Sequence, residues 1–189
     1  MGKTKIKKTA LRMAGFNINY DREKDDFYTT PPEATQSLLN KEKFVGNVLE
    51  PACGIGTMSE ILIKNGYDVV ASDLVDRGYG KTGIDFLKTT EQYDNVITNP
   101  PFILASNFIL HSFKIARKKV AIFGKLTALE GVKRKEIIYS QKKLKKVLVF
   151  TRRVSFTKPD SNKVAGGLIA FAWYIFDLDY NGLPQVDWI

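Results

Sequence analysis

Short apolar runs alternate with longer amphipathic stretches along this chain from Phe44 onward. The short runs are rich in β-branched or aromatic residues and are bounded by Gly, Pro, Asn or Asp, which is typical of β-strands. The longer stretches carry apolar residues at helical spacing. The predicted strands are Val45–Glu50, Asp68–Ser72, Asn95–Thr98, Val120–Phe123, Val147–Thr151 and Leu168–Phe176, and the predicted helices are Met58–Lys64, Ser106–Arg117 and Arg134–Lys143.

This alternation predicts an α/β fold in which helices cover both faces of a mostly parallel sheet. The last predicted strand is the exception in direction. Only the Phe156–Gly167 connection precedes it, which is too short for a crossover helix, so we expect this strand to run antiparallel to its predecessor. We expect residues 1–26 to form a flexible polar arm and residues 27–189 to form a single domain.

Composition narrows the class of protein. A chain of 189 residues with 44% hydrophobic content fits one globular domain. No run approaches the roughly 18 apolar residues that a membrane helix needs, and the basic N-terminus lacks the apolar core of a secretory signal. The single cysteine, Cys53, excludes an internal disulfide, and the single histidine, His111, has no second histidine with which to bind a metal. We therefore expect a cytoplasmic protein without a metal site.

The net charge of +9 is distributed unevenly. Residues 114–163 carry sixteen basic and three acidic side chains, an excess of +13, whereas residues 20–113 carry eight basic and fourteen acidic ones. A nucleic acid requires a concentrated basic surface, because each Lys or Arg that neutralises a phosphate releases a condensed counterion. The pattern favours a nucleic-acid partner, although a solvated basic helix face has the same composition.

A strand that runs into a glycine-rich turn and then a helix is the first candidate binding element. It reads Val48-Leu-Glu-Pro-Ala-Cys-Gly-Ile-Gly-Thr57. Its glycines let the backbone approach a ligand, and the helix N-terminus offers unpaired N–H groups. Ser59 stands where a dinucleotide fingerprint requires a third glycine or an alanine, so that fingerprint is absent.

Two acids follow this turn. Asp73 ends the apolar run Val69–Ser72 about twenty residues after the glycines, where a nucleoside-binding fold places the acceptor for ribose hydroxyls. Asp85 and Phe86 form an acid and aromatic pair suited to the edge and face of an adenine.

The Asn99-Pro-Pro-Phe102 segment, after the strand Asn95–Thr98, is the strongest chemical signal. The two prolines fix φ and remove backbone donors, so the loop holds the Asn99 amide oxygen and the Pro100 carbonyl as rigid acceptors beside the flat Phe102 ring. An exocyclic amine is a poor nucleophile because its lone pair is delocalised into the ring. Two fixed acceptors for its protons favour a pyramidal nitrogen, and positioning with preset dipoles replaces a strong base.

Elements in this order resemble class I S-adenosylmethionine-dependent methyltransferases, and Asn99-Pro-Pro-Phe102 resembles the motif of adenine-N6 DNA methyltransferases. Phe27-Tyr-Thr-Thr-Pro31 resembles their N-terminal Phe-Tyr-x-Thr-Pro motif, and the C-terminal region is similar to small phage-type members. The resemblance covers residues 26–189, with Glu50 where Asp is commoner and without a segment long enough for a separate target-recognition domain. The resemblance implies a Rossmann-like fold with a seven-stranded sheet. Because no separate target-recognition segment is present, we expect adenines in short or loosely defined sequence contexts.

The resemblance also implies a cofactor, S-adenosylmethionine, and residues that bind it. Asp73 would hold the ribose, Asp85 and Phe86 the adenine, and Tyr28 and Thr29 would close over the methionine. The full implied cofactor set is Tyr28, Thr29, Glu50, Pro51, Gly54, Gly56, Asp73, Asp85, Phe86 and Asn99. The implied catalytic set, which would hold a base flipped out of the duplex, is Asn99, Pro100, Pro101 and Phe102.

Two alternatives stay open. The same fold could methylate an RNA base amine or a protein glutamine amide, because Asn-Pro-Pro-aromatic loops also serve those groups. The chain could also be a non-catalytic nucleic-acid-binding module on a methyltransferase scaffold. The basic stretch favours nucleic acid over protein as substrate, and no motif is visibly broken.

Overall fold

The computed structural model describes residues 28–158, 161–166 and 169–189. The predicted arm, residues 1–26, lies outside the described residues, as do Phe27 and Leu168. The described elements, in chain order, are α2 (Pro32–Lys41), β1 (Val48–Glu50), α3 (Thr57–Lys64), β2 (Val69–Ala71), η2 (Phe86–Lys88), β3 (Tyr93–Thr98), α4 (Ala105–Ile115), β4 (Ala116–Lys125), η3 (Leu126–Leu129), α5 (Val132–Ile137), η4 (Tyr139–Gln141), β5 (Leu144–Val149), β6 (Ser155–Lys158), β7 (Ser161–Gly166), β8 (Phe171–Asp177) and β9 (Gln185–Trp188).

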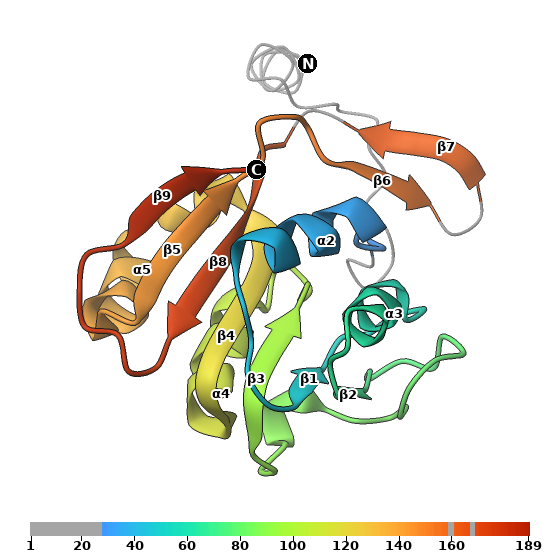
Figure 1. Cartoon of the computed structure of the whole chain (residues 1–189), viewed down its shortest axis with the longest axis horizontal. Coiled ribbons are helices and arrows are strands. Elements are labelled where there is room, and N and C mark those ends of the chain that lie inside the picture. Colours follow the sequence, from blue (N-terminus) through green and yellow to red (C-terminus); the bar gives the residue numbers. More distant parts are fainter. Residues whose placement is uncertain (1–27, 159–160, 167–168) are drawn as a thin grey trace, which may run out of the picture.

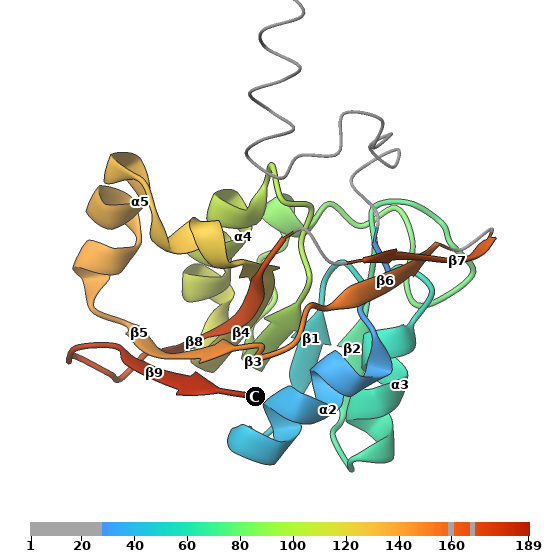
Figure 2. The ribbon, with the colours of Figure 1, turned by 90° about the horizontal axis from the view of Figure 1, so that it is seen from above.

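A seven-stranded sheet in the order β2-β1-β3-β4-β8-β5-β9 forms the centre of the molecule (Figure 1). β8 pairs antiparallel with both β4 and β5, and the other pairings in this sheet are parallel. The predicted mostly parallel sheet and the reversed strand after Gly167 are both confirmed. α2 and α3 cover one face of the sheet, and α4 and α5 cover the other (Figure 2).

The central strands β3, β4 and β8 are largely buried on both faces. Because successive side chains point to opposite sides of a strand, each of these strands contributes to two core clusters. In β8, Trp173 and Ile175 join the core cluster that contains α2 and α3 residues, whereas Tyr174 and Phe176 join the cluster that contains α4 residues. The Trp173 indole also donates to the Ala34 carbonyl at 2.9 Å, which fixes α2 on the sheet. Continuous apolar runs in the sequence therefore correspond to strands with a helix layer on each side.

Several predicted boundaries were wrong, and local backbone geometry explains most of them. Residues 45–47 are not part of β1, since Gly46 has a φ of +93° that an extended strand cannot accommodate. The predicted helix Ser106–Arg117 ends at Ile115, because Ala116 already pairs with Tyr93 as the first residue of β4. The predicted helix Arg134–Lys143 is divided into α5 and η4 and ends where Lys142 adopts a φ of 55°.

Three features were not predicted. α2 begins after Pro31, with a proline in its first turn, and buries only a short stripe of residues. β9 pairs with β5 at the edge of the sheet. The described residues of the predicted Phe156–Gly167 connection form much of the antiparallel hairpin β6–β7, a separate two-stranded sheet. Among the described residues, no helix is long and apolar enough to cross a membrane.

Candidate active site

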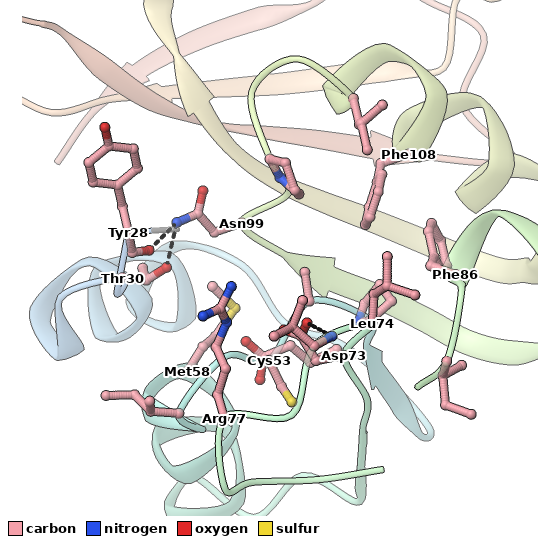
Figure 3. Close-up of a pocket in the computed structure, with 18 of the residues that line it drawn as sticks. Tyr28, Thr30, Cys53, Met58, Asp73, Leu74, Arg77, Phe86, Asn99 and Phe108 are labelled. Carbon is pink, nitrogen blue, oxygen red and sulfur yellow. Dashed lines mark hydrogen bonds between the residues drawn. The ribbon is translucent and has the colours of Figure 1, made fainter. Parts of the chain in front are cut away.

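A cavity of about 520 Å³ lies at the carboxyl ends of β1, β2 and β3, where parallel strands in an open α/β sheet present their ligand sites. Residues 28–30, which precede α2, form part of its wall (Figure 3). The lining includes nine of the residues predicted from the sequence: Tyr28, Thr29, Glu50, Pro51, Asp73, Asp85, Phe86, Asn99 and Pro101. Four further predicted residues lie outside this lining: Gly54, Gly56, Pro100 and Phe102.

Glu50 ends β1 and is only 2% exposed. The Ser59 hydroxyl, from the first turns of α3, donates a hydrogen bond to its carboxyl group. Burial raises the pKa of Glu50 to about 8, more than the Ser59 hydrogen bond lowers it. A buried carboxyl group of this kind is costly to ionise alone, and a cationic ligand group in the cavity would favour its ionised form.

Asp73 organises the backbone at the end of β2. One carboxylate oxygen accepts from the Gly54 N–H at 2.8 Å, and the other accepts from the Val75 N–H at 2.9 Å. Each oxygen keeps a further lone pair for a ligand, because a carboxylate can accept about four hydrogen bonds. Gly54 therefore contributes to this wall through its link to Asp73.

Gly56 sits at the start of α3 with a φ of +88°, a left-handed conformation that L side chains rarely adopt. A Cβ at this position would lie 2.4 Å from the Tyr79 ring. The second glycine of the turn is thus required by the backbone conformation and by the close approach of Tyr79.

Phe86 and Phe108 form an apolar part of the cavity wall. Phe86 is 3% exposed and packs against Phe108, with ring centroids 4.7 Å apart. Asp85 begins η2 by accepting from the Leu87 N–H at 3.1 Å, and it pairs with Lys88 at 3.0 Å. The Lys88 ammonium group lowers the pKa of Asp85. Asp85 and Phe86 therefore both line the cavity, and their role in binding adenine stays a prediction.

Asn99 follows β3 directly, and its side-chain orientation is fixed by the segment before α2. Its Nδ2 donates to the Tyr28 carbonyl at 3.1 Å and to the Thr30 hydroxyl at 3.0 Å (Figure 3). The Tyr28 carbonyl can only accept, so the neighbouring amide atom must be the nitrogen. Both N–H bonds of the amide are then directed at the protein, and Oδ1 remains as the acceptor that Asn99 can offer a ligand.

The rest of the proline motif has a different environment. Pro101 lines the cavity and Pro100 is buried behind it. The half-buried Phe102 stacks on Tyr28, with centroids 5.8 Å apart and planes at 21°, and the Lys125 ammonium group lies 4.2 Å above its ring centre. In this arrangement Phe102 supports the aromatic cluster around Phe171.

The Thr29 hydroxyl is an unexplained polar group in the cavity wall. Its oxygen is buried and has no hydrogen-bond partner among the described residues. Buried polar groups nearly always have a partner, so an orphaned one at a cavity wall is a position that a bound ligand can satisfy.

Sequence reasoning missed part of the lining. Thr30 follows the predicted Tyr28-Thr29 pair and holds Asn99. Arg77 lies on the loop after β2 (Figure 3). The exposed apolar residues at the cavity are Ile55, Leu74, Val75, Ile84, Ile103 and Leu104. They stand in irregular segments without periodicity, so no sequence pattern marks them. Cys53 also lines the cavity, and burial raises the pKa of its thiol to about 12, so the thiol stays protonated.

The strand order, the reversed β8 and the cavity at the carboxyl ends of the strands define a Rossmann-like fold of the class I methyltransferase type, as the sequence predicts. No protein-family model and no curated protein matches the chain. Among solved structures it is similar to a proposed RNA methyltransferase from Pyrococcus horikoshii, with a TM-score of 0.63 and 18% identity over 91% of this chain and 98% of that one.

Two further solved structures show the same fold. A modification subunit of a proposed type I restriction enzyme from Vibrio vulnificus has a TM-score of 0.58 and 15% identity over 98% of this chain and 51% of that one. Magnesium protoporphyrin IX methyltransferase from Synechocystis, solved with bound S-adenosylmethionine, has a TM-score of 0.51 and 15% identity over 77% of this chain and 78% of that one. At these sequence identities, the similarity to the three structures shows a shared fold only.

Proposed function

We propose that this protein is an S-adenosylmethionine-dependent methyltransferase that acts on the exocyclic N6 amine of adenine in DNA. The observation that carries the proposal is the fixed amide of Asn99. Because both of its N–H bonds are directed at the protein, Asn99 can only accept a hydrogen bond from a substrate. A substrate that donates an N–H bond, such as a base amine or an amide, is therefore favoured over one that presents a carbonyl oxygen.

The cavity fits the proposed cofactor in size and chemistry. Its volume of about 520 Å³ lies within the range of small-molecule sites. The buried carboxyl group of Glu50 and the orphaned Thr29 hydroxyl suit the polar, cationic methionine end. Asp73 suits the ribose, and the apolar surface of Phe86 suits the adenine ring. When bound, the cofactor would supply an electrophilic methyl group on a sulfonium sulfur.

The chain's own residues would act by positioning. Asn99 Oδ1, and in our proposal the Pro100 carbonyl, would accept hydrogen bonds from the two amine N–H groups and direct the nitrogen lone pair away from the ring. After the methyl group has been transferred, the nitrogen would lose one proton to water. The same acceptors stabilise the positive charge that develops on the nitrogen during transfer. The tight Pro100-Pro101 turn keeps these atoms fixed without reorganisation.

DNA is the favoured substrate because of the basic stretch and the resemblance of Asn99-Pro-Pro-Phe102 to adenine-N6 DNA methyltransferases. The fold neighbours are consistent with nucleic acid as substrate, since they include a proposed RNA methyltransferase and a restriction modification subunit. RNA is the second candidate, supported by the first of these neighbours.

Transfer of a labelled methyl group from S-adenosylmethionine to DNA, RNA and total protein, measured in parallel, tests the proposal. We expect N6-methyladenine in DNA as the product. Asn99→Ala should abolish transfer while calorimetry shows little change in cofactor affinity, since Asn99 acts mainly on the target amine. Asn65→Ala, on an exposed asparagine at the end of α3, is the matched control. Wild-type turnover by Asn99→Ala would exclude this mechanism.

A further inference from the structure

The structure divides the basic part of the sequence into lysines with acidic partners and lysines without them. Four lysines of β4 and β5 form ion pairs with acids from other parts of the chain: Lys118 with Asp94, Lys119 and Lys146 with Glu42, and Lys145 with Asp177. Three carboxylates thus offset these four lysine charges inside the protein. Part of the excess of +13 in residues 114–163 is therefore not available to a polyanion.

A groove of about 560 Å³ lies between α4 and α5 and contains uncompensated cations. Its lining includes Lys114, Lys133 and Arg134, together with the polar side chains of Ser106 and Asn107. The residues that line it include no acid. Glu130 and Glu136 are exposed neighbours on the same segment but lie outside the lining. The groove is thus a concave surface of one charge sign.

The cations of the groove differ in how firmly they are held. Arg134 donates from Nε to the Glu130 carbonyl at 2.7 Å and from a terminal nitrogen to the Thr127 carbonyl at 3.3 Å, so its guanidinium group is fixed to the wall. Lys114 and Lys133 are exposed, and within the described ranges neither ammonium group has a hydrogen bond or an ion pair. Both ammonium groups are therefore open to contact with an anionic partner.

The groove also lies beside the candidate active site. α4 begins directly after the loop that carries Asn99 and Pro101, and Leu87 lines both the cavity and the groove. α4 and α5 lie on the same face of the sheet (Figure 2). A polymer whose reacting base entered the cavity would have its neighbouring backbone close to this groove.

We propose that the α4–α5 groove binds the phosphodiester backbone of the DNA strand that flanks the target base, with Lys114 and Lys133 as phosphate contacts. This inference rests on the proposed function for its substrate class. Both lysines are exposed and have no acidic partner among the residues that the structure describes, which suits contacts that neutralise phosphates without reading bases. Such contacts supply affinity that falls as salt rises.

Salt-dependent binding of a labelled adenine-containing DNA duplex tests the groove directly. For Lys114→Ala/Lys133→Ala we expect the slope of log K against log salt to become shallower by about 1.8, because each lost phosphate contact removes about 0.9. Lys43→Ala/Lys64→Ala is the matched control. Both lysines are exposed, Lys43 shortly after the end of α2 and Lys64 at the end of α3, and their replacement removes the same charge. The control should keep the wild-type slope, and both double variants should keep the wild-type melting temperature.

Equal slopes for the groove variant and the control would overturn the proposal, because binding would then depend on total charge. The proposal would also be overturned if the groove variant lost affinity for an RNA hairpin while its affinity for the DNA duplex stayed unchanged. Methyl transfer by the wild-type protein to the same duplex is measured separately. A protein that binds DNA through the groove but transfers no methyl group refutes the proposed function alone, whereas active transfer with an unchanged slope refutes the groove alone.

Discussion

Replacing Thr30 by valine should lower the rate of methyl transfer while leaving cofactor affinity almost unchanged. Thr30 is 6% exposed, and its hydroxyl oxygen accepts from Asn99 Nδ2 at 3.0 Å. Valine has the same branched shape and lacks the acceptor, so packing is largely preserved and one hydrogen bond is removed. Thr30 is, in this interpretation, a positioning residue that acts through Asn99.

The size of the effect follows from the two hydrogen bonds of the amide. Without the Thr30 oxygen, one N–H bond of Asn99 loses its partner at a largely enclosed position, which costs about 1–3 kcal/mol. The remaining bond, to the Tyr28 carbonyl at 3.1 Å, still disfavours the flipped amide, because flipping would bring two acceptor oxygens together. A loss of this size in the transition state corresponds to a decrease in kcat of about 5- to 150-fold.

Steady-state transfer kinetics with Thr30→Val and Thr30→Ser provide the test. Serine keeps the hydroxyl group and should recover most of the wild-type kcat, whereas valine should not. The cofactor KM and the melting temperature should be similar for the two variants. A Thr30→Val enzyme with wild-type kcat, or a Thr30→Ser enzyme as slow as the valine variant, would refute the role of this hydroxyl in orienting Asn99.

Two predictions concern the glycine-rich turn and its acid. Because the pKa of Glu50 is raised from 4.5 to about 8, the native protein binds a proton that the unfolded chain has released between these values, so stability should fall by up to about 1.4 kcal/mol per pH unit over this window. Melting temperatures of Glu50→Gln should lack this decrease, and those of the exposed control Glu136→Gln should keep it. Gly56→Ala should destabilise the protein more than Gly66→Ala, since both glycines have a φ near +88° but only the Cβ at Gly56 meets Tyr79. If urea denaturation showed the same loss of unfolding free energy for both variants, backbone strain alone would explain both losses.

The central sheet could be predicted from the sequence because its signal is local and strong. β8 and the Val120–Phe123 part of β4 lie between helix layers, so nearly all of their side chains are apolar and the runs are easy to recognise. The reversed direction of β8 follows from chain length alone, since the preceding connection is too short for a crossover. The positions of Glu50, Asp73 and Asn99 at strand ends then place them at one edge of the sheet.

Elements with weak local signals escaped prediction. α2 buries only Ala34, Thr35, Leu38 and Leu39, a stripe too short to stand out as a helical period. β9 is four residues long and mostly exposed, and only its pairing with β5 defines it. The compensation of lysines is likewise invisible in composition, because Glu42 meets Lys146 across 104 residues of sequence.

The orientation of Asn99 shows most clearly why the site required a structure. The motif Asn99-Pro-Pro-Phe102 indicates that an amide lies at a strand end, but an amide has a donor side and an acceptor side. Which side faces the substrate depends on Tyr28 and Thr30, which are 71 and 69 residues earlier in the chain. The carbonyl and hydroxyl oxygens of the segment before α2 therefore leave Asn99 with its amide oxygen as the free acceptor. A substitution at Thr30 should consequently alter the chemistry of the site without touching the recognised motif.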